Sequence, residues 1–131
     1  MTLPRSSAPS GESLPVHQTP SRLPSIDGCA RFGAAWSLAV PLAGGVYFIH
    51  DLRGVLYVGR TGSLRKRFSE HLVNSHNPSL RRALVCPIGQ LYFSWIRCVS
   101  VDGQSQMERS LIKLLRPTCN VMMNDLATVL H

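Results

Sequence analysis

The stretch Gly45–His71, with the sequence GVYFIHDLRGVLYVGRTGSLRKRFSEH, decides the fold of this chain of 131 residues. Two apolar runs within it, GVYFIH and VLYVG, are rich in β-branched and aromatic residues, and a short connection ending in Gly54 joins them. This pattern predicts a β-hairpin. A three-residue loop with Gly54 in the left-handed position of a G1 bulge would place Tyr47 opposite Tyr57 on one face of the hairpin.

A helix is predicted directly after the hairpin. Ser63 is a suitable N-cap, and Leu64 and Phe68 begin an apolar stripe at helical spacing. Arg67 and His71 are also four residues apart, so they share a stripe that borders the apolar one. Two phenols, a guanidinium and an imidazole are therefore expected to meet where the helix packs on the hairpin. Such a set of side chains is typical of an active site.

The remaining chain adds a strand and further helices. Alternating apolar residues over 91–99 predict a strand, and an apolar face at helical spacing predicts a helix over 102–115. Shorter helices are expected to begin at Pro78 and to cover residues 121–131. The element order β–β–α–(α)–β–α predicts the α+β class, an α/β sandwich with a three-stranded antiparallel sheet flanked by helices.

The N-terminal part of the chain differs in composition from the rest. Residues 1–25 hold five of the nine prolines among Ser and Thr, which predicts a disordered tail. It is interpreted as a tether, a partner-binding tail or sequence upstream of the true start site, with an organelle transit peptide as a further alternative. Residues 26–42 form an apolar lead-in segment expected to pack on the domain of residues 43–131. Trp36 in this segment is predicted to anchor in the core rather than to stack on bases.

The charge of the chain indicates a nucleic-acid partner. Fourteen Lys and Arg residues against seven acids give a net charge of +7, which favours binding to phosphate. No apolar run reaches the roughly 18 residues of a membrane span, so no membrane association is predicted. The four cysteines form no CxxC pair and no convincing secretory signal is present. We therefore expect reduced thiols and a cytoplasmic location, with nucleoid association in a bacterial host.

Two tripeptides and their spacing give the chain a family resemblance. Gly45-Val46-Tyr47 and Tyr57-Val58-Gly59, followed by an Arg-rich helix start and by Glu108 and Asn120, resemble the motifs of the GIY-YIG nuclease family over about residues 43–121. Both tripeptides depart from the family pattern by a conservative exchange of Val for Ile. The resemblance implies the GIY-YIG fold for residues 43–131. It also implies a divalent-metal-dependent endonuclease that hydrolyses DNA phosphodiester bonds in DNA repair or recombination.

The resemblance assigns Glu108 as the single metal-binding carboxylate and Arg67 as the group that binds the scissile phosphate. A carboxylate suits a hard cation, Mg²⁺ or Mn²⁺, with waters completing its shell. One carboxylate cannot hold the paired ions of a two-metal nuclease, so one ion is expected. Without the resemblance, Glu108 reads as an ordinary surface residue of a helix.

The other candidate residues surround these two. Tyr47 and Tyr57 are the two tyrosines of the motif, and either can be the general base if nearby cations lower its pKa. His71 is expected to relay a proton or to bind a phenol. A second group is expected to bind phosphate, and it comprises Arg60, Arg65 and Lys66. Asn120 is expected to orient the loop around the site.

A module that binds nucleic acid on the same fold without cutting it is the alternative function. The partner is DNA in both cases, contacted through its phosphate backbone. Residues 1–25 offer a surface for a possible protein partner.

Overall fold

The computed structural model describes residues 24–120, so the predicted helix over 121–131 and most of the predicted tail lie outside the described residues. The elements along the chain are β1 (Gly28–Arg31), the 3-10 helix η2 (Ala34–Ala39), β2 (Gly45–Asp51), β3 (Gly54–Thr61), α2 (Leu64–Asn74), α3 (Pro78–Val85), β4 (Tyr92–Arg97) and α4 (Val101–Leu115). Within these residues, no helix combines the length and the apolar character needed to cross a membrane.

The strands form an antiparallel sheet in the order β1-β4-β2-β3. The predicted α+β class is confirmed, but the expectation of three strands was wrong because the lead-in segment supplies a fourth. β1 pairs with β4, with Ala30 opposite Phe93. Its Gly28 has no side chain, and a Cβ atom there would overlap the indole ring of Trp95. A four-residue strand with the sequence GCAR lacks the apolar alternation by which strands are recognised.

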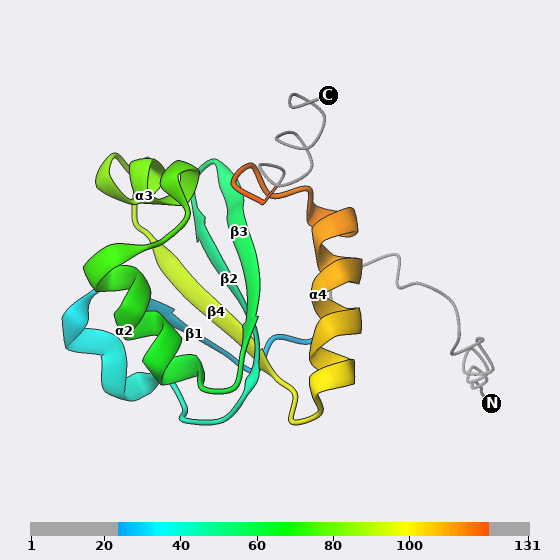
Figure 1. The fold of residues 1–131 in the computed structure, drawn as a ribbon. Coiled ribbons are helices and arrows are strands. Elements are labelled where there is room, and N and C mark those ends of the chain that lie inside the picture. Colours follow the sequence, from blue (N-terminus) through cyan, green and yellow to red (C-terminus); the bar gives the residue numbers. More distant parts are fainter. Residues whose placement is uncertain (1–23, 121–131) are drawn as a thin grey trace, which may run out of the picture.

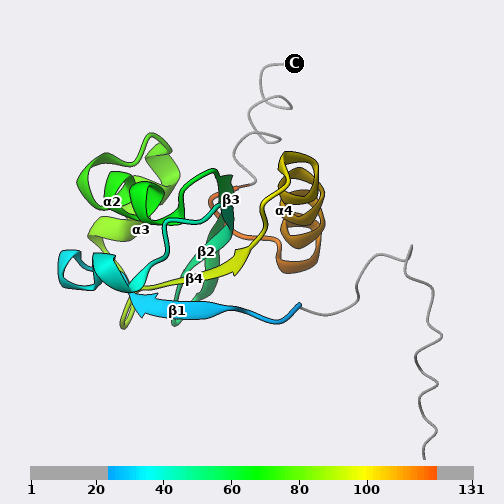
Figure 2. The same ribbon diagram turned by 90° about the horizontal axis from the view of Figure 1, so that it is seen from below.

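Helices cover both faces of the sheet (Figures 1 and 2). α2 and α3 lie over one face, and α4 lies over the other. β2 is buried on both sides because it is a central strand, with Tyr47 packed toward Phe68 of α2 and Val46 packed toward Leu111 of α4. The sheet edge formed by β3 therefore runs between two helical layers.

The lead-in segment packs beside α2, but not through Trp36. This side chain is 45% exposed, and η2 contributes no buried residue. The prediction of a core anchor was wrong. Ala30 and Val40 anchor the segment in the core instead. Arg65 adds polar contacts, donating from Nε to the carbonyl oxygen of Val40 at 2.8 Å and from Nη2 to that of Leu38 at 3.4 Å.

The hairpin of β2 and β3 has a different register from the one predicted. Tyr47 lies opposite Gly59, whereas Tyr57 lies opposite Ile49. Gly54 does have a positive φ of 112°, but the pairing of Asp51 with Gly54 closes a two-residue loop. The extra residue of β3 is Leu56, where the register shifts. A Cβ atom at Gly59 would overlap the Tyr47 phenol, so this glycine lets the ring lie across β3.

Candidate active site

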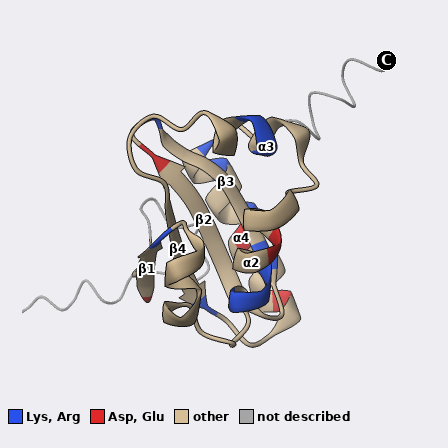
Figure 3. Ribbon diagram, turned by 90° about the vertical axis from the view of Figure 1, so that its left-hand side faces the viewer, with Lys and Arg blue, Asp and Glu red and all other residues tan. Residues whose placement is uncertain are grey.

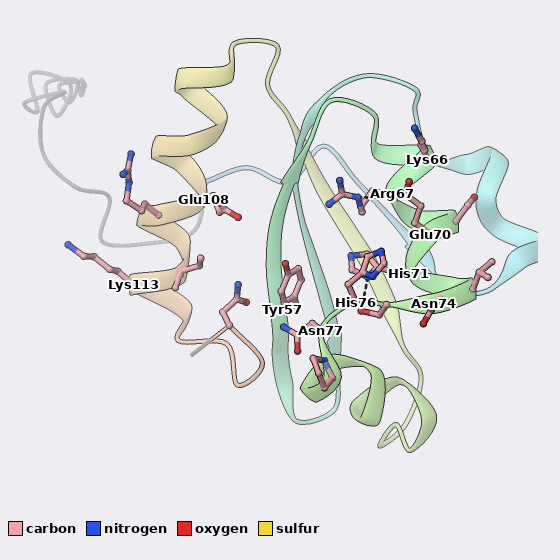
Figure 4. A pocket seen from close by; sticks show the side chains of 17 residues that line it. Tyr57, Lys66, Arg67, Glu70, His71, Asn74, His76, Asn77, Glu108 and Lys113 are labelled. Atoms are coloured by element: carbon pink, nitrogen blue, oxygen red, sulfur yellow. Dashed lines mark hydrogen bonds and ion pairs between the residues drawn. The ribbon is translucent and has the colours of Figure 1, made fainter. Parts of the chain in front are cut away.

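A groove follows the β3 edge of the sheet, between α4 on one side and α2 with the α2–α3 connection on the other (Figure 4). Its volume of about 1340 Å³ exceeds the roughly 300–1,000 Å³ of pockets for small molecules. Six of the side chains predicted from the sequence line it, namely Tyr57, Lys66, Arg67, His71, Glu108 and Asn120. The fold thus brings residues of β3, α2 and α4 to one surface.

Glu108 is placed by the packing of α4. Ser100 caps this helix by accepting from the backbone N–H of Gly103, and Leu111 is buried against the sheet. The neighbouring stripe of the helix then faces the groove, where the Glu108 side chain is 25% exposed. Its Oε1 atom accepts from Nε of Arg60 at 3.2 Å.

The donor set around Glu108 suits a hard divalent cation. Its Oε2 atom has no hydrogen-bond partner among residues 24–120, so a negatively charged oxygen is available at the groove wall. The described residues contain no cluster of three or more His, Cys, Asp or Glu side chains. This arrangement fits one ion held by a single carboxylate and waters.

Arg67 lies on the opposite wall, in the first turns of α2. Ser63 caps this helix as predicted, accepting from the backbone N–H of Lys66 at 3.4 Å. The Arg67 side chain is half-exposed, and its Nε donates to Oε1 of Glu70 at 2.8 Å. The guanidinium carries five N–H donors in all, so most of them are left for an anion in the groove.

Tyr47 and His71 form a buried chain of hydrogen bonds beneath the groove. The Tyr47 hydroxyl lies 2.8 Å from Nε2 of His71, and Nδ1 of His71 lies 3.2 Å from the Ser75 hydroxyl. Burial, and then the proximity of Tyr57, raise the pKa of Tyr47. Burial, and then the positive charge of Arg67, lower the pKa of His71 to about 4. Both groups are therefore neutral at pH 7, and the hydrogen bonds from Tyr47 through His71 to Ser75 orient the two rings without placing a charge beneath the groove.

Tyr57 is the tyrosine that faces the groove. Its ring lies 6.0 Å from the Tyr47 ring and 5.7 Å from the His71 ring, centroid to centroid. Tyr47 is fully buried, whereas Tyr57 is half-buried and lines the groove. Burial, and then the negative charge of Glu108, raise the pKa of Tyr57, while Arg67 acts in the opposite direction.

Asn120 joins the loop after α4 to the edge strand. Its Oδ1 accepts from the backbone N–H of Val58 at 2.6 Å, and its Nδ2 donates to the carbonyl oxygen of Val58 at 2.8 Å. The side chain amide thereby satisfies both backbone groups of the residue next to Tyr57, which an edge strand would otherwise leave unpaired. This contact fixes the backbone beside the phenol.

The family follows from a comparison with known protein domains. The model of the GIY-YIG catalytic domain matches residues 43–121. The chain belongs to this family. The prediction of a GIY-YIG endonuclease domain, made from the two tripeptides, their spacing and the downstream Glu108 and Asn120, is confirmed at the level of family and fold.

UvrABC system protein C from several organisms is similar to this GIY-YIG chain. UvrABC system protein C of Legionella pneumophila (strain Lens) is 36% identical over 87 residues, which are 66% of this chain and 14% of that protein. The same protein of Methanothermobacter thermautotrophicus is 34% identical over 90 residues, again 14% of its length. The chain thus spans about one seventh of these relatives.

Among solved structures, the GIY-YIG N-terminal endonuclease domain of UvrC from Thermotoga maritima, bound to its catalytic magnesium, has the same fold. The TM-score is 0.54 at 23% identity, and the match covers 66% of this chain and 93% of that domain.

The three predicted phosphate-binding residues occupy different places in the GIY-YIG domain. Lys66 lines the groove. Arg60 contacts Glu108 from β3. Arg65 lies away from the groove, and its guanidinium donates hydrogen bonds to the backbone carbonyl oxygens at the end of η2. Their roles toward phosphate stay predictions.

Two residues at the groove were not predicted from the sequence. Asn77 caps α3 and also donates from Nδ2 to the carbonyl oxygen of Cys119 at 3.0 Å, so it joins the two walls of the groove. Ser75 ends the chain of hydrogen bonds from Tyr47. The sequence Asn77-Pro78 signals a helix start, but a contact across 42 residues leaves no local pattern.

The low pKa of His71 predicts a stability that falls in acid. The folded value of about 4 lies below the roughly 6.5 of an unfolded chain, so the unfolded state binds more protons between these values. Between pH 7 and pH 4 the wild type should therefore lose about 3 kcal/mol more unfolding free energy than His71→Gln. Urea unfolding of both proteins at several pH values checks this, because groups such as His50 titrate alike in both. Parallel pH curves would contradict it.

Proposed function

We propose that this chain is a divalent-metal-dependent endonuclease that hydrolyses DNA phosphodiester bonds in the groove along β3. The observation that carries the proposal is the convergence of Tyr57, Arg67 and Glu108, which lie on three separate elements, around one groove. Membership of the GIY-YIG family supports it, as does the catalytic magnesium of the UvrC domain with the same fold. Figure 3 shows Lys and Arg segments of α2 and α3 on the side that faces the viewer. Positive charge there would attract the phosphate backbone of DNA.

In this proposal Glu108 holds one Mg²⁺ or Mn²⁺ ion. When bound, the ion supplies Lewis-acid stabilisation to the charge that grows on the phosphate oxygens. Arg67, on the facing wall, binds a phosphate oxygen and stabilises the same charge through its free N–H donors.

Tyr57 acts as the general base. A base must reach the attacking water, and the exposure of Tyr57 to the groove favours it over the fully buried Tyr47. The water oxygen forms a bond to phosphorus as its proton passes to the Tyr57 phenolate, and the bond from phosphorus to the leaving oxygen breaks. The leaving oxygen takes up a proton from solvent, so one product ends in a phosphate monoester and the other in a hydroxyl, and the Tyr57 phenol then returns its proton to solvent. Tyr47 and His71 hold the Tyr57 ring in position from below.

A cleavage panel tests the proposal. Labelled single-stranded, duplex, flap and junction DNAs are incubated with the protein and Mg²⁺ or Mn²⁺, with EDTA as the control. We expect cleavage of at least one DNA that stops with EDTA and returns when the metal is added back. Salt-sensitive DNA binding without any product under either metal would instead support the alternative, a binding module on the same fold.

A further inference from the structure

The ion pair between Arg60 and Glu108 joins β3 to α4 at the wall of the groove. Arg60 follows Val58 on the α4 side of β3, because alternate residues of a strand share a face, and its partner across the hairpin is Val46. The Nε atom lies 3.2 Å from Oε1 of Glu108, and the two side chains are 45% and 25% exposed.

This pair differs from the other two ion pairs among residues 24–120. The Asp51 side chain is fully buried at the hairpin loop, where its carboxylate accepts hydrogen bonds from the Arg53 guanidinium and from the backbone N–H of Ile88. That pair is structural. Arg67 and Glu70 are neighbours on one helix. The contact of Arg60 is a single, long, partly exposed hydrogen bond between two elements, which contributes little to stability and can be exchanged for another ligand.

We propose that Arg60 is a counter-ion that holds the Glu108 carboxylate when no divalent cation is bound, and that Arg60 thereby sets the affinity of the site for that cation. The inference rests on the proposed function, in which Glu108 is the metal ligand. Arg60 is a positioning residue in this scheme, since it acts through Glu108.

Arg60 acts on the Glu108 carboxylate in two ways. The hydrogen bond occupies Oε1 of Glu108, so a cation that takes this oxygen must first displace the guanidinium. The guanidinium also places a permanent positive charge beside the carboxylate, which repels an incoming dication. Because Arg60 is almost half exposed, solvent screens this repulsion, and we expect it to weaken cation binding by roughly three- to tenfold.

The same exchange gives Arg60 a second state. A cation that takes over the Glu108 carboxylate releases the guanidinium, which is then free to contact a phosphate oxygen beside the groove. This exchange gives a role to the basic residue that directly follows Tyr57-Val58-Gly59, although its side chain pairs with Glu108 before the cation binds.

Mn²⁺ binding, measured by the electron paramagnetic resonance signal of the free ion, tests the proposal without reference to cleavage. Arg60→Gln should bind Mn²⁺ roughly three- to tenfold more tightly than the wild type, and Arg60→Lys should lie within twofold of it. The matched control is Arg109→Gln. Arg109 is next to Glu108 in sequence, but its guanidinium contacts Ser105 rather than the Glu108 carboxylate. This variant should also lie within twofold. Unchanged or weaker binding by Arg60→Gln would overturn the proposal.

Two further measurements separate the possible failures. Glu108→Gln should abolish Mn²⁺ binding; if it binds as the wild type does, Glu108 is not the ligand and the proposed function fails with the inference. If only Arg60→Gln is unchanged, the inference alone fails. In the wild type, the NMR signal of the Arg60 Nε–H should shift on titration with Mg²⁺ but not with an equal ionic strength of NaCl. This readout requires no variant to fold, and a signal that does not respond would count against the exchange.

Discussion

Replacing Glu108 by glutamine is expected to reduce metal-dependent DNA cleavage by about 1,000-fold while leaving the domain folded. Glutamine keeps the shape of the side chain, and its carbonyl oxygen can still accept from Arg60. It lacks the negative charge that attracts a dication, and the described residues offer no cluster of acids or histidines that could replace it. The loss corresponds to several kcal/mol of transition-state stabilisation, which is the range expected for removal of a metal or of an equivalent electrostatic group.

The matched control for this prediction is Asp102→Asn. Asp102 lies on the same helix, in its first turn, and is exposed outside the groove. Its removal should lower stability by less than about 1 kcal/mol through the helix dipole and leave cleavage within about twofold. Single-turnover cleavage of the DNA selected by the panel, with thermal melting of each variant, makes the measurement. A Glu108→Gln protein that keeps more than a tenth of wild-type activity would refute the assignment of this carboxylate.

Local patterns in the sequence were sufficient to predict most of the fold. The hairpin, α2 and α4 were predictable because the two strands have β-branched and aromatic runs, and the helices have caps and apolar stripes. β1 was not, because four residues without alternation become a strand only when β4 offers them an edge. Trp36 was misplaced because a large aromatic ring predicts burial on average, whereas this segment buries its small side chains Ala30 and Val40 instead.

For the candidate site, the identity of the residues could be predicted from local motifs, whereas their arrangement depends on long-range contacts. Glu108 and Arg67 could be predicted as site residues from motif positions, but their place on facing walls of one groove depends on how α4 and α2 pack on opposite faces of the sheet. The register of Tyr47 and Tyr57 depends on a bulge at Leu56, which turn chemistry does not specify. The contacts that tune the site, from Tyr47 to His71 and from Arg60 to Glu108, span 24 and 48 residues. Such contacts arise from tertiary packing and leave no trace in local sequence.

The two tyrosines of the motif give the second large prediction, because the structure places them in different environments. Tyr57→Phe removes the hydroxyl that faces the groove and should lower cleavage by about 1,000-fold, within the roughly 10²–10⁴-fold typical of a general base. Tyr47→Phe is its matched control, since the ring stays packed against Phe93 and only the hydrogen bond to His71 is lost. We expect that variant to lose no more than about tenfold, through a less well oriented Tyr57.

The pH dependence of the wild type follows from the same assignment. The pKa of Tyr57 is raised by burial and by Glu108, so at neutral pH the base is mostly protonated and only a small fraction is active. As long as the pH is below the pKa, each unit increase in pH raises that fraction tenfold. We therefore expect kcat/KM to rise with unit slope from about pH 6 up to the pKa that the base has in the presence of the cations of the site. Arg67 opposes the raised pKa, so Arg67→Gln should move the plateau to higher pH as well as lowering the rate. Equal losses in Tyr57→Phe and Tyr47→Phe, or a wild-type rate that falls as pH rises from 6 to 8, would rule out Tyr57 as the base.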